Sequence, residues 1–254
     1  MTAPLSLIRL RPDAQALMRW AMPRGYLSHR ADLGYALHAA LKAALGELAP
    51  RPFVWRERRE SPELLGYVRC AADDIKTAAA LPRVDGGEAA VALRLLAVEA
   101  SAMPGHWRAG QRLSFEVRVR PIVRSRSDPQ AKEKGSRRHV EVDAALYHAS
   151  EQDAPIGHEK AYCSWLAARI EHRGAKLVQA RLVTRRSVGV LRRPQISGER
   201  KPVVTQGPEA VFQGVLEIAS PEAFHAGLLL GVGRHCAFGF GMMLLAPPGA
   251  FEPC

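Results

Sequence analysis

The order of strand-like and helix-like segments constrains the fold of this 254-residue chain most, because both halves show the same order. Each half has a strand, a helical segment and two strands, followed by a second helix and a fourth strand. This βαββαβ order is the ferredoxin-like arrangement. The sequence therefore predicts an α+β fold with two tandem ferredoxin-like, or RRM-like, βαββαβ domains. These are expected over 1–103 and 111–254, with a linker near Met103 to Gly110.

In the first half, the clearest helix carries a leucine at every fourth position from Leu33 to Leu45. Residues with this spacing return to one helical face, so the stripe is predicted to be buried. Asp32 is a suitable N-cap, and the helix is expected to run to about Leu48. Turn residues separate runs of strand-forming residues around it. The other predicted elements are strands over 5–11, 53–58, 64–70 and 90–100 and a helix over 73–81.

In the second half, strict alternation marks the first strand, 112–123, in which Leu113, Phe115 and Val117 share one side. A period of two is that of a strand with one buried face. Ser220 and Pro221 open a helix, since proline suits the first helical position. The remaining predictions are a helix around 158–172, strands over 175–186 and 210–219, and a closing strand over 236–246.

The charge balance favours a polyanionic partner, since the chain has 36 Lys and Arg against 25 Asp and Glu, a formal net charge of +11.

The chain has 4 cysteines and no C-x-x-C pair, which argues against a zinc site or a disulfide framework. Reduced thiols fit a cytoplasmic location. A signal peptide is not predicted, because the first residues contain no long apolar run. A membrane span is not predicted either, because the longest uncharged run contains glycines and a Pro-Pro pair.

Four glycines, at 231, 233, 239 and 241, stand in one short segment that also contains Arg234 and His235. Glycine permits positive φ and close approach of another chain. The N–H groups of such a loop can hold a phosphate or an RNA backbone. It is no dinucleotide fingerprint, because Cys236 stands at the third glycine position, and it lacks the Gly-Lys-Ser/Thr of a Walker A loop. RNA binding and a purely structural cap and hinge both remain open.

The stretch PEAFHAGLLLGVGRHCAFGFGMMLLAP, 221–247, resembles the carboxy-terminal signature of the RAMP superfamily of CRISPR proteins, and of its CasE-type members in particular. There too, a short helix leads into a loop of the pattern G-h-G-x5-G-x-G, with h apolar, and a closing strand. SFEVRVRPIVRS (114–125) resembles the family's arginine-bearing strand, KAYCSWLAARIEHRGAKL (160–177) its Trp-Leu helix, and AVFQGVLEI (210–218) the strand before the last helix.

The resemblance implies an endoribonuclease that cuts CRISPR precursor RNA at the repeat hairpin. In this metal-independent reaction the 2′-OH attacks the adjacent phosphate and leaves a 2′,3′-cyclic phosphate and a 5′-OH. The enzyme would stay on its crRNA with other subunits of a Cascade complex. No metal ligands and no cofactor are predicted.

RADLGYALHAAL, 30–41, resembles the family's D-L-x-Y-x-x-H helix, whose Tyr and His line the cleavage site. They map onto Tyr35 and His38, which share one helical face with Lys42. Histidine suits proton transfer near neutral pH, so His38 is the expected general acid or base. Tyr35 would orient the phosphate or nucleophile, and Lys42 or an arginine would steady the developing charge. Tyr26 and His29, also three residues apart, are the alternative pair.

Two basic stretches, 117–138 and 181–201, predict an RNA track. The residues expected to contact RNA are Arg118, Arg120, Arg124, Arg126, Arg137, Arg138, Arg185, Arg186, Arg192 and Arg193, with Gly231, Gly233, Arg234, His235, Gly239 and Gly241 of the glycine loop. Two alternatives remain: a non-catalytic RAMP subunit that binds guide RNA, and a tandem RRM-like module without enzymatic activity. The aromatic signatures of classical RRM domains are missing from the predicted central strands.

Overall fold

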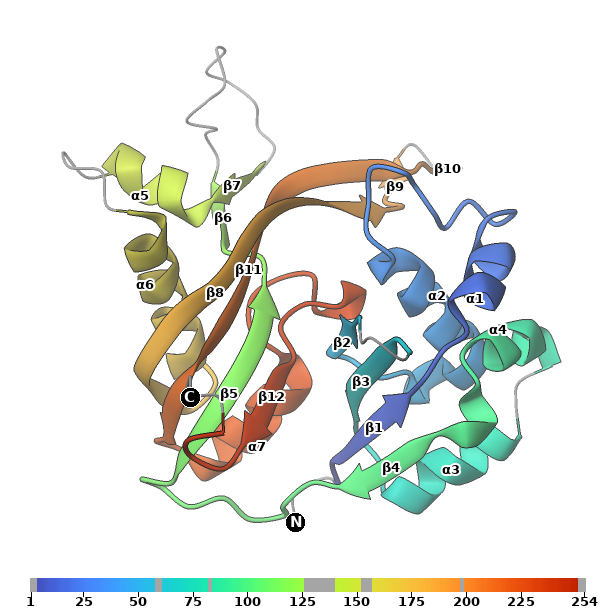
Figure 1. Cartoon of the computed structure of the whole chain (residues 1–254), viewed down its shortest axis with the longest axis horizontal. Helices are drawn as coiled ribbons and strands as arrows, with labels where there is room; N and C mark the ends of the chain where they lie inside the picture. Colours follow the sequence, from blue (N-terminus) through green and yellow to red (C-terminus); the bar gives the residue numbers. More distant parts are fainter. Residues whose placement is uncertain are drawn as a thin grey trace.

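A computed structural model describes residues 4–57, 61–81, 84–125, 140–151, 157–196 and 199–250. Two four-stranded sheets lie next to each other in it (Figure 1), with the strand orders β2-β3-β1-β4 and β12-β5-β11-β8. Numbered from one to four within each half, the strands of both sheets read 4-1-3-2, and all neighbouring strands are antiparallel. The predicted α+β fold of two ferredoxin-like units is confirmed.

The first sheet is covered by the leucine-striped helix, as the spacing predicts. Leu37 and Leu41 are fully buried and belong to one core cluster with Ile8 of the central strand. The strands are β1 (Ser6–Leu10), β2 (Phe53–Arg56), β3 (Glu63–Val68) and β4 (Glu99–Ala102). The helices are α1 (Ala14–Ala21), α2 (Gly34–Leu45), α3 (Ala72–Ala80) and α4 (Gly87–Ala92), with 3-10 turns η1 (Gly46–Leu48), η2 (Val84–Gly86) and η3 (Leu95–Ala97).

The second sheet buries the alternating face of its first strand, where Phe115, Val117 and Val119 join the core. Its strands are β5 (Arg112–Val119), β8 (Ala175–Arg192), β11 (Val203–Ile218) and β12 (Met243–Ala246). Beside them lie α5 (Ala144–Glu151), α6 (His158–Glu171), α7 (Pro221–Leu230) and η4 (Cys236–Phe238). Two further pairs are β6 (Ile122–Ser125) with β7 (Val140–Asp143), and β9 (Gln195–Ile196) with β10 (Glu199–Arg200).

Buried contacts join the two halves. Leu5, Val54 and Leu65 of the first half belong to the same core cluster as Phe115 of the second. The buried Tyr67 hydroxyl donates a hydrogen bond to the carbonyl of Met243, 2.8 Å away. Because a buried polar pair needs good geometry, this bond holds β3 and β12 in one relative position.

The predicted strand over 90–100 is wrong. Residues 87–92 form α4, residues 95–97 form η3, and only 99–102 pair in the sheet. The burial pattern gives the reason: Ala89, Ala92 and Leu93 are buried, while Val91 is 73% exposed. That spacing is helical, and a short apolar run does not distinguish a strand from a buried helix.

Three smaller differences concern helix ends and the last strand. Helix α1 was not predicted, although Asp13 caps it by accepting a hydrogen bond from the Ala16 N–H at 2.9 Å. The N-cap of α2 is Leu33 rather than Asp32. The predicted closing strand begins only at Met243, because residues 236–238 form the 3-10 turn η4.

Strands β8 and β11 extend well beyond the predicted segments, as 18-residue and 16-residue strands. Their far end reaches the segment that precedes α2 (Figure 1). There the Asp32 N–H donates to the Gly189 carbonyl at 3.0 Å, and the Gln206 amide donates to the Arg30 carbonyl at 3.0 Å. The long pair therefore fixes the start of the candidate catalytic helix.

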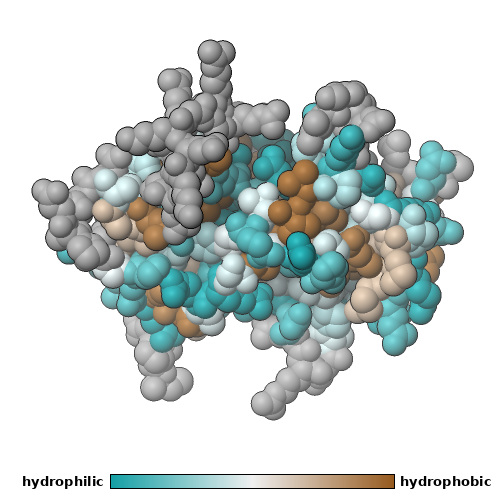
Figure 2. All heavy atoms as spheres, turned by 90° about the horizontal axis from the view of Figure 1, so that it is seen from above, coloured by the Kyte–Doolittle hydropathy of each residue, from teal (hydrophilic) through white to brown (hydrophobic). Residues whose placement is uncertain are grey.

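The face seen from above is mostly hydrophilic, with hydrophobic residues gathered near its middle (Figure 2). Within the described residues, no helix combines the length and the apolarity needed to span a bilayer.

Candidate active site

The candidate catalytic helix and the glycine loop meet in one aromatic cluster. Phe238 of η4 stacks on Tyr35, with ring centroids 5.9 Å apart and planes at 24°. The same phenyl ring meets His38 edge-on at 5.3 Å, and Tyr35 and His38 lie 6.5 Å apart. The approach is close, because a Cβ at Gly34 would lie 2.2 Å from the Phe238 carbonyl oxygen. The two motifs that carry the family resemblance thus form a single site.

His38 is half-buried at the wall of a cavity of about 270 Å³, called here the His38 pocket. Burial lowers the pKa of His38, and the nearby positive charges of Lys42 and Arg51 lower this pKa further. The imidazole is therefore neutral at pH 7, with a free nitrogen able to accept a proton.

Three cations line the His38 pocket, and they differ in their partners. The Lys42 ammonium donates to the Gly46 carbonyl at 3.2 Å and pairs with Glu47 at 2.9 Å. Arg51 and Arg69 are exposed, and in the described part of the chain neither guanidinium has a hydrogen bond or an ion pair. The sequence interpretation missed both arginines, because only the pairing of β2 with β3 brings them to His38.

The alternative pair lies elsewhere. His29 is exposed and lines a larger groove to which Phe238 also contributes, and it does not line the His38 pocket. Tyr26 packs against Tyr35 and against Trp20, with ring centroids 5.6 Å apart in both contacts. Tyr26 therefore packs within the aromatic cluster around Tyr35, whereas His29 lines the larger groove.

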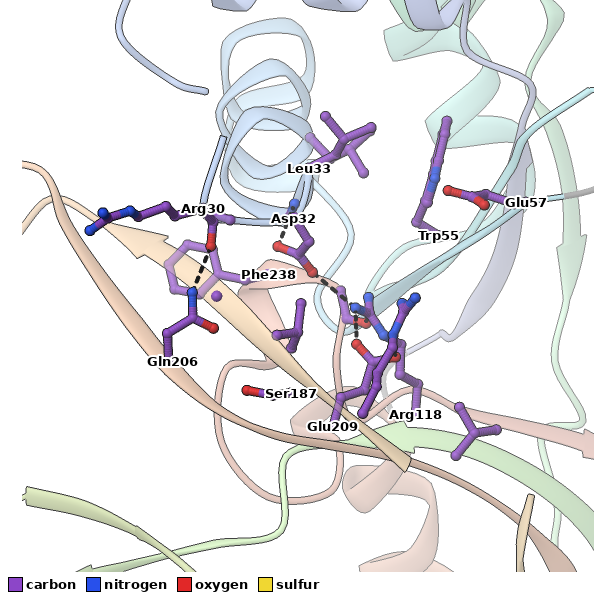
Figure 3. Close-up of a pocket in the computed structure, with 18 of the residues that line it drawn as sticks. Arg30, Asp32, Leu33, Trp55, Glu57, Arg118, Ser187, Gln206, Glu209 and Phe238 are labelled. Carbon is purple, nitrogen blue, oxygen red and sulfur yellow. Dashed lines mark hydrogen bonds and ion pairs between the residues drawn. The ribbon is translucent and has the colours of Figure 1, made fainter. Parts of the chain in front are cut away.

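The larger groove, called here the Asp32 groove, has a volume of about 800 Å³ and lies between the segment before α2, β2, β8, β11 and the glycine loop (Figure 3). Asp32, Arg118 and Glu209 point toward one another in it. The Arg118 guanidinium pairs with Asp32 at 2.9 Å and also with Glu209, and it lies 4.2 Å from the ring centre of Phe240. Asp32 in turn accepts a hydrogen bond from the Gly34 N–H at 3.1 Å.

Glu209 is the buried member of this network. Burial alone would raise the pKa of Glu209, but the hydrogen bonds and charges of Arg118 and Arg186 lower it overall. Arg186 approaches Glu209 at 2.8 Å and is otherwise exposed. The network connects β5 and β11 to the first residues of α2. Arg118 therefore has a structural role in the protein without bound RNA.

Arg120, also predicted to contact RNA, is 1% exposed. Its guanidinium donates to the carbonyls of Val188 and Thr205 at 3.4–3.5 Å, and burial lowers its pKa. A Cβ at Gly207 would lie 2.3 Å from this guanidinium. Arg120 therefore fastens β5 to the long strands, and a contact with RNA stays a prediction for it.

The other predicted arginines are more accessible. Arg124 and Arg185 are exposed, while Arg192 and Arg193 are half-buried. Arg192 approaches Glu141 at 3.7 Å, and Arg193 donates to the Arg24 carbonyl at 3.2 Å. Arg126, Arg137 and Arg138 lie outside the described residues.

Within the glycine loop, the side chains of Arg234 and His235 face Glu141 of β7. Arg234 and His235 each approach this carboxylate at 2.9 Å. Burial opposes ionisation of Glu141, yet these two partners lower its pKa to about 2. His235 is 3% exposed as a side chain, so it is not free to meet a ligand.

Backbone N–H groups of the loop also donate hydrogen bonds to carbonyls of the protein. The Val232 N–H donates to the Gly241 carbonyl at 2.8 Å, and the Gly241 N–H donates to the Arg118 carbonyl at 2.7 Å. Gly231, Gly233, Gly239 and Gly241 all have positive φ, between 72° and 87°. Packing and backbone conformation thus account for the four glycines, and RNA binding by the loop stays a prediction.

Among the described residues, no three His, Cys, Asp or Glu side chains come together as ligands of a metal ion would.

The chain belongs to a family of CRISPR-associated proteins: the family model described as "CRISPR associated protein" matches residues 5–247. The match includes α2, both sheets and the glycine loop. Among curated proteins, no sequence match to this chain is found. The predicted membership of a CRISPR protein family is confirmed.

Solved structures share the fold over nearly the whole chain. Cse3 of Thermus thermophilus bound to an RNA representing a pre-cleavage complex has 20% identity and a TM-score of 0.59, covering 96% of this chain and 100% of that one. Cas6e from Escherichia coli str. K-12 has 18% identity and a TM-score of 0.53, covering 95% and 99%. A chain of a CRISPR RNA-guided surveillance complex, pre-nicking, has 17% identity and a TM-score of 0.51, again covering 95% and 99%. At these identities the similarity establishes the fold.

Proposed function

We propose that this chain is an endoribonuclease that cuts CRISPR precursor RNA at the repeat hairpin without a metal ion. The observation that carries the proposal is the His38 pocket, in which a neutral imidazole lies beside cations at the contact between the two family motifs. The domains of this enzyme are taken as 1–103 and 111–254, and it works in the cytoplasm.

In the proposed reaction, the 2′-OH attacks the adjacent phosphate, the 5′-oxygen leaves, and the products are a 2′,3′-cyclic phosphate and a 5′-OH. His38 transfers one of the two protons. Its lowered pKa favours the neutral form that a general base needs. Tyr35 is held by Phe238 and Tyr26, which suits a group that orients the phosphate or the nucleophile.

Binding to the hairpin is assigned to exposed arginines of the second half, mainly Arg124, Arg185 and Arg186. A-form RNA hides its major-groove base edges, so contacts with phosphates should dominate. The net charge of +11 supports such an interface. Retention on crRNA beside other Cascade subunits is supported by the similarity in fold to a chain of a surveillance complex.

One experiment separates this proposal from its alternatives. The protein is incubated with a repeat hairpin in EDTA, and products are separated on a gel beside those of a substrate with hydrogen in place of the 2′-OH before the scissile phosphate. We expect cleavage of the all-RNA hairpin only. Binding without cleavage would indicate a guide-RNA-binding subunit, and equal affinity for unstructured RNA would indicate an RRM-like module. Cleavage of the deoxy substrate would exclude transesterification.

A further inference from the structure

The His38 pocket contains two arginines to which the sequence interpretation gave no role. Its wall is formed by α2, by the segment from η1 to Arg51, and by the end of β3 at Arg69. Among the residues that the structure describes, three positively charged side chains and one carboxylate, Glu47, line it. The pocket therefore has an excess of positive charge beside the imidazole.

Among these charges, Lys42 is the one already engaged. Its ammonium pairs with Glu47 at 2.9 Å and donates to the Gly46 carbonyl at 3.2 Å, so lysine and carboxylate offset each other. The guanidinium groups of Arg51 and Arg69 have no such partner in the described part of the chain. An anion in the pocket would find these two groups ready to donate hydrogen bonds.

The backbone at Arg51 is held in place, although its side chain is exposed. The Arg51 N–H donates to the Tyr67 carbonyl at 3.2 Å, and the Tyr67 N–H donates to the Pro52 carbonyl at 3.1 Å. Tyr67 is anchored in turn by its buried hydroxyl. Arg51 and Arg69 therefore extend from one rigid frame, and the charge of Arg51 reaches His38 closely enough to affect its pKa.

We propose that Arg51, assisted by Arg69, binds the phosphodiester at which His38 transfers its proton, and that Lys42 does not. A guanidinium presents a planar fork that matches two phosphate oxygens, and it holds the charge that develops on them. This inference rests on the proposed function, because it deepens the chemistry of the same pocket.

A measurement without RNA tests the binding site itself. The pH titration of the labelled His38 ring is followed by NMR with and without inorganic phosphate. We expect phosphate to raise the pKa of His38 in the unmodified protein and in Lys42→Ala, and to have no effect in Arg51→Ala. Without phosphate, Arg51→Ala should itself raise this pKa, because a neighbouring positive charge is removed. A phosphate response that survives in Arg51→Ala but is lost in Lys42→Ala would overturn the inference.

Single-turnover cleavage of the repeat hairpin provides the second test. Loss of a group that stabilises the developing charge typically costs about 10²–10³-fold in rate, which is the loss expected for Arg51→Ala. Arg51→Lys keeps the positive charge without the planar fork and should recover part of the lost rate. The control is Arg108→Ala, because Arg108 is exposed and lies outside the pocket, and this variant should cleave at the unmodified rate. Full activity of Arg51→Ala beside an inactive His38→Ala would refute the role of Arg51 and leave the proposed function intact. If the unmodified protein does not cut, the proposed function fails, and the phosphate titration still decides whether Arg51 holds an anion.

Discussion

The His38 pocket and the Asp32 groove lie at different faces of the same helix, and they use arginine in opposite ways. In the groove, Arg118 is paired with Asp32 and Glu209, and Arg186 reaches Glu209 as well. In the pocket, the guanidinium groups of Arg51 and Arg69 have no protein partner in the described part of the chain. The net positive charge is thus divided between cations that hold α2 in place and cations available to a polyanion.

The two candidate histidines lie in different regions, since His38 lines the pocket and His29 lines the groove. Loss of a general acid or base costs about 10²–10⁴-fold in rate, which is the loss expected for His38→Ala. His29→Ala should retain nearly full activity, since this exposed side chain is separated from the pocket. The measurement is the single-turnover rate at saturating protein, with hairpin affinity measured in parallel. Full activity of His38→Ala with loss in His29→Ala would transfer the role to the groove.

The next largest effect is expected in the groove, on stability. Arg118→Ala leaves Asp32 and Glu209 without their shared cation, and breaking a buried pair in this way costs about 3–5 kcal/mol. For a chain of this size the corresponding fall in Tm is on the order of 10 °C. Exposed Arg124, replaced by alanine, is the control and should leave Tm nearly unchanged.

The pH dependence of the same pair of variants sharpens this prediction. The pKa of Glu209 is lowered in the folded protein, so its contribution to stability is present above the unfolded value of 4.5 and is lost as pH falls through the folded value. Arg118→Ala should therefore show a smaller loss of Tm on acidification than the unmodified protein. Equal Tm values for both variants at pH 7 would mean that Arg118 does not hold the groove together.

The glycine loop, which lies between the two regions, should show a smaller effect. Gly239 and Gly249 both have φ near 87°, and an alanine strains each by about 1–2 kcal/mol. The Gly249 Cβ would meet nothing within 4 Å, whereas the Gly239 Cβ would lie 3.4 Å from the Arg118 guanidinium. We expect Gly239→Ala to lower Tm slightly more than Gly249→Ala, and hairpin affinity per folded molecule is measured for both variants. A loss of affinity in Gly239→Ala alone would favour the interpretation that the loop binds RNA.

Local periodicity was sufficient to predict most of the fold. The leucines of α2 and the alternation of β5 are repeated patterns, so their buried faces could be read directly from the spacing. The segment from 90 to 100 failed because it is apolar with no decisive period. It contains the end of α4, where Ala92 is buried, then η3 and the first residues of β4. Helix α1 could have been found, since Asp13 and the buried Leu17, Trp20 and Ala21 have the spacing of a capped helix.

The candidate site could be predicted only in part. Tyr35 and His38 share a helical face by spacing alone, but their contact with Phe238 depends on how the halves pack. The same limit explains the arginines: strand alternation places Arg118 and Arg120 on the face opposite the core of β5, where solvent was expected. The glycine loop and the long strands cover that face, and no local pattern in the sequence reports this.

The smallest expected effect is on the salt dependence of RNA binding, and it compares exposed with buried arginines directly. Each phosphate contact contributes about one unit to the slope of log affinity against log salt concentration. Arg124→Ala should therefore reduce the slope by about one unit at nearly unchanged Tm, because the side chain is exposed. Arg120→Ala should lower Tm and leave the slope unchanged, because this guanidinium is buried against the carbonyls of Val188 and Thr205. Affinity for the hairpin is measured over a series of salt concentrations, at a temperature where both variants are folded. A reduced slope in Arg120→Ala would mean that RNA binding opens the contact between β5 and the long strands, and that the division between structural and RNA-facing arginines is not fixed in the complex.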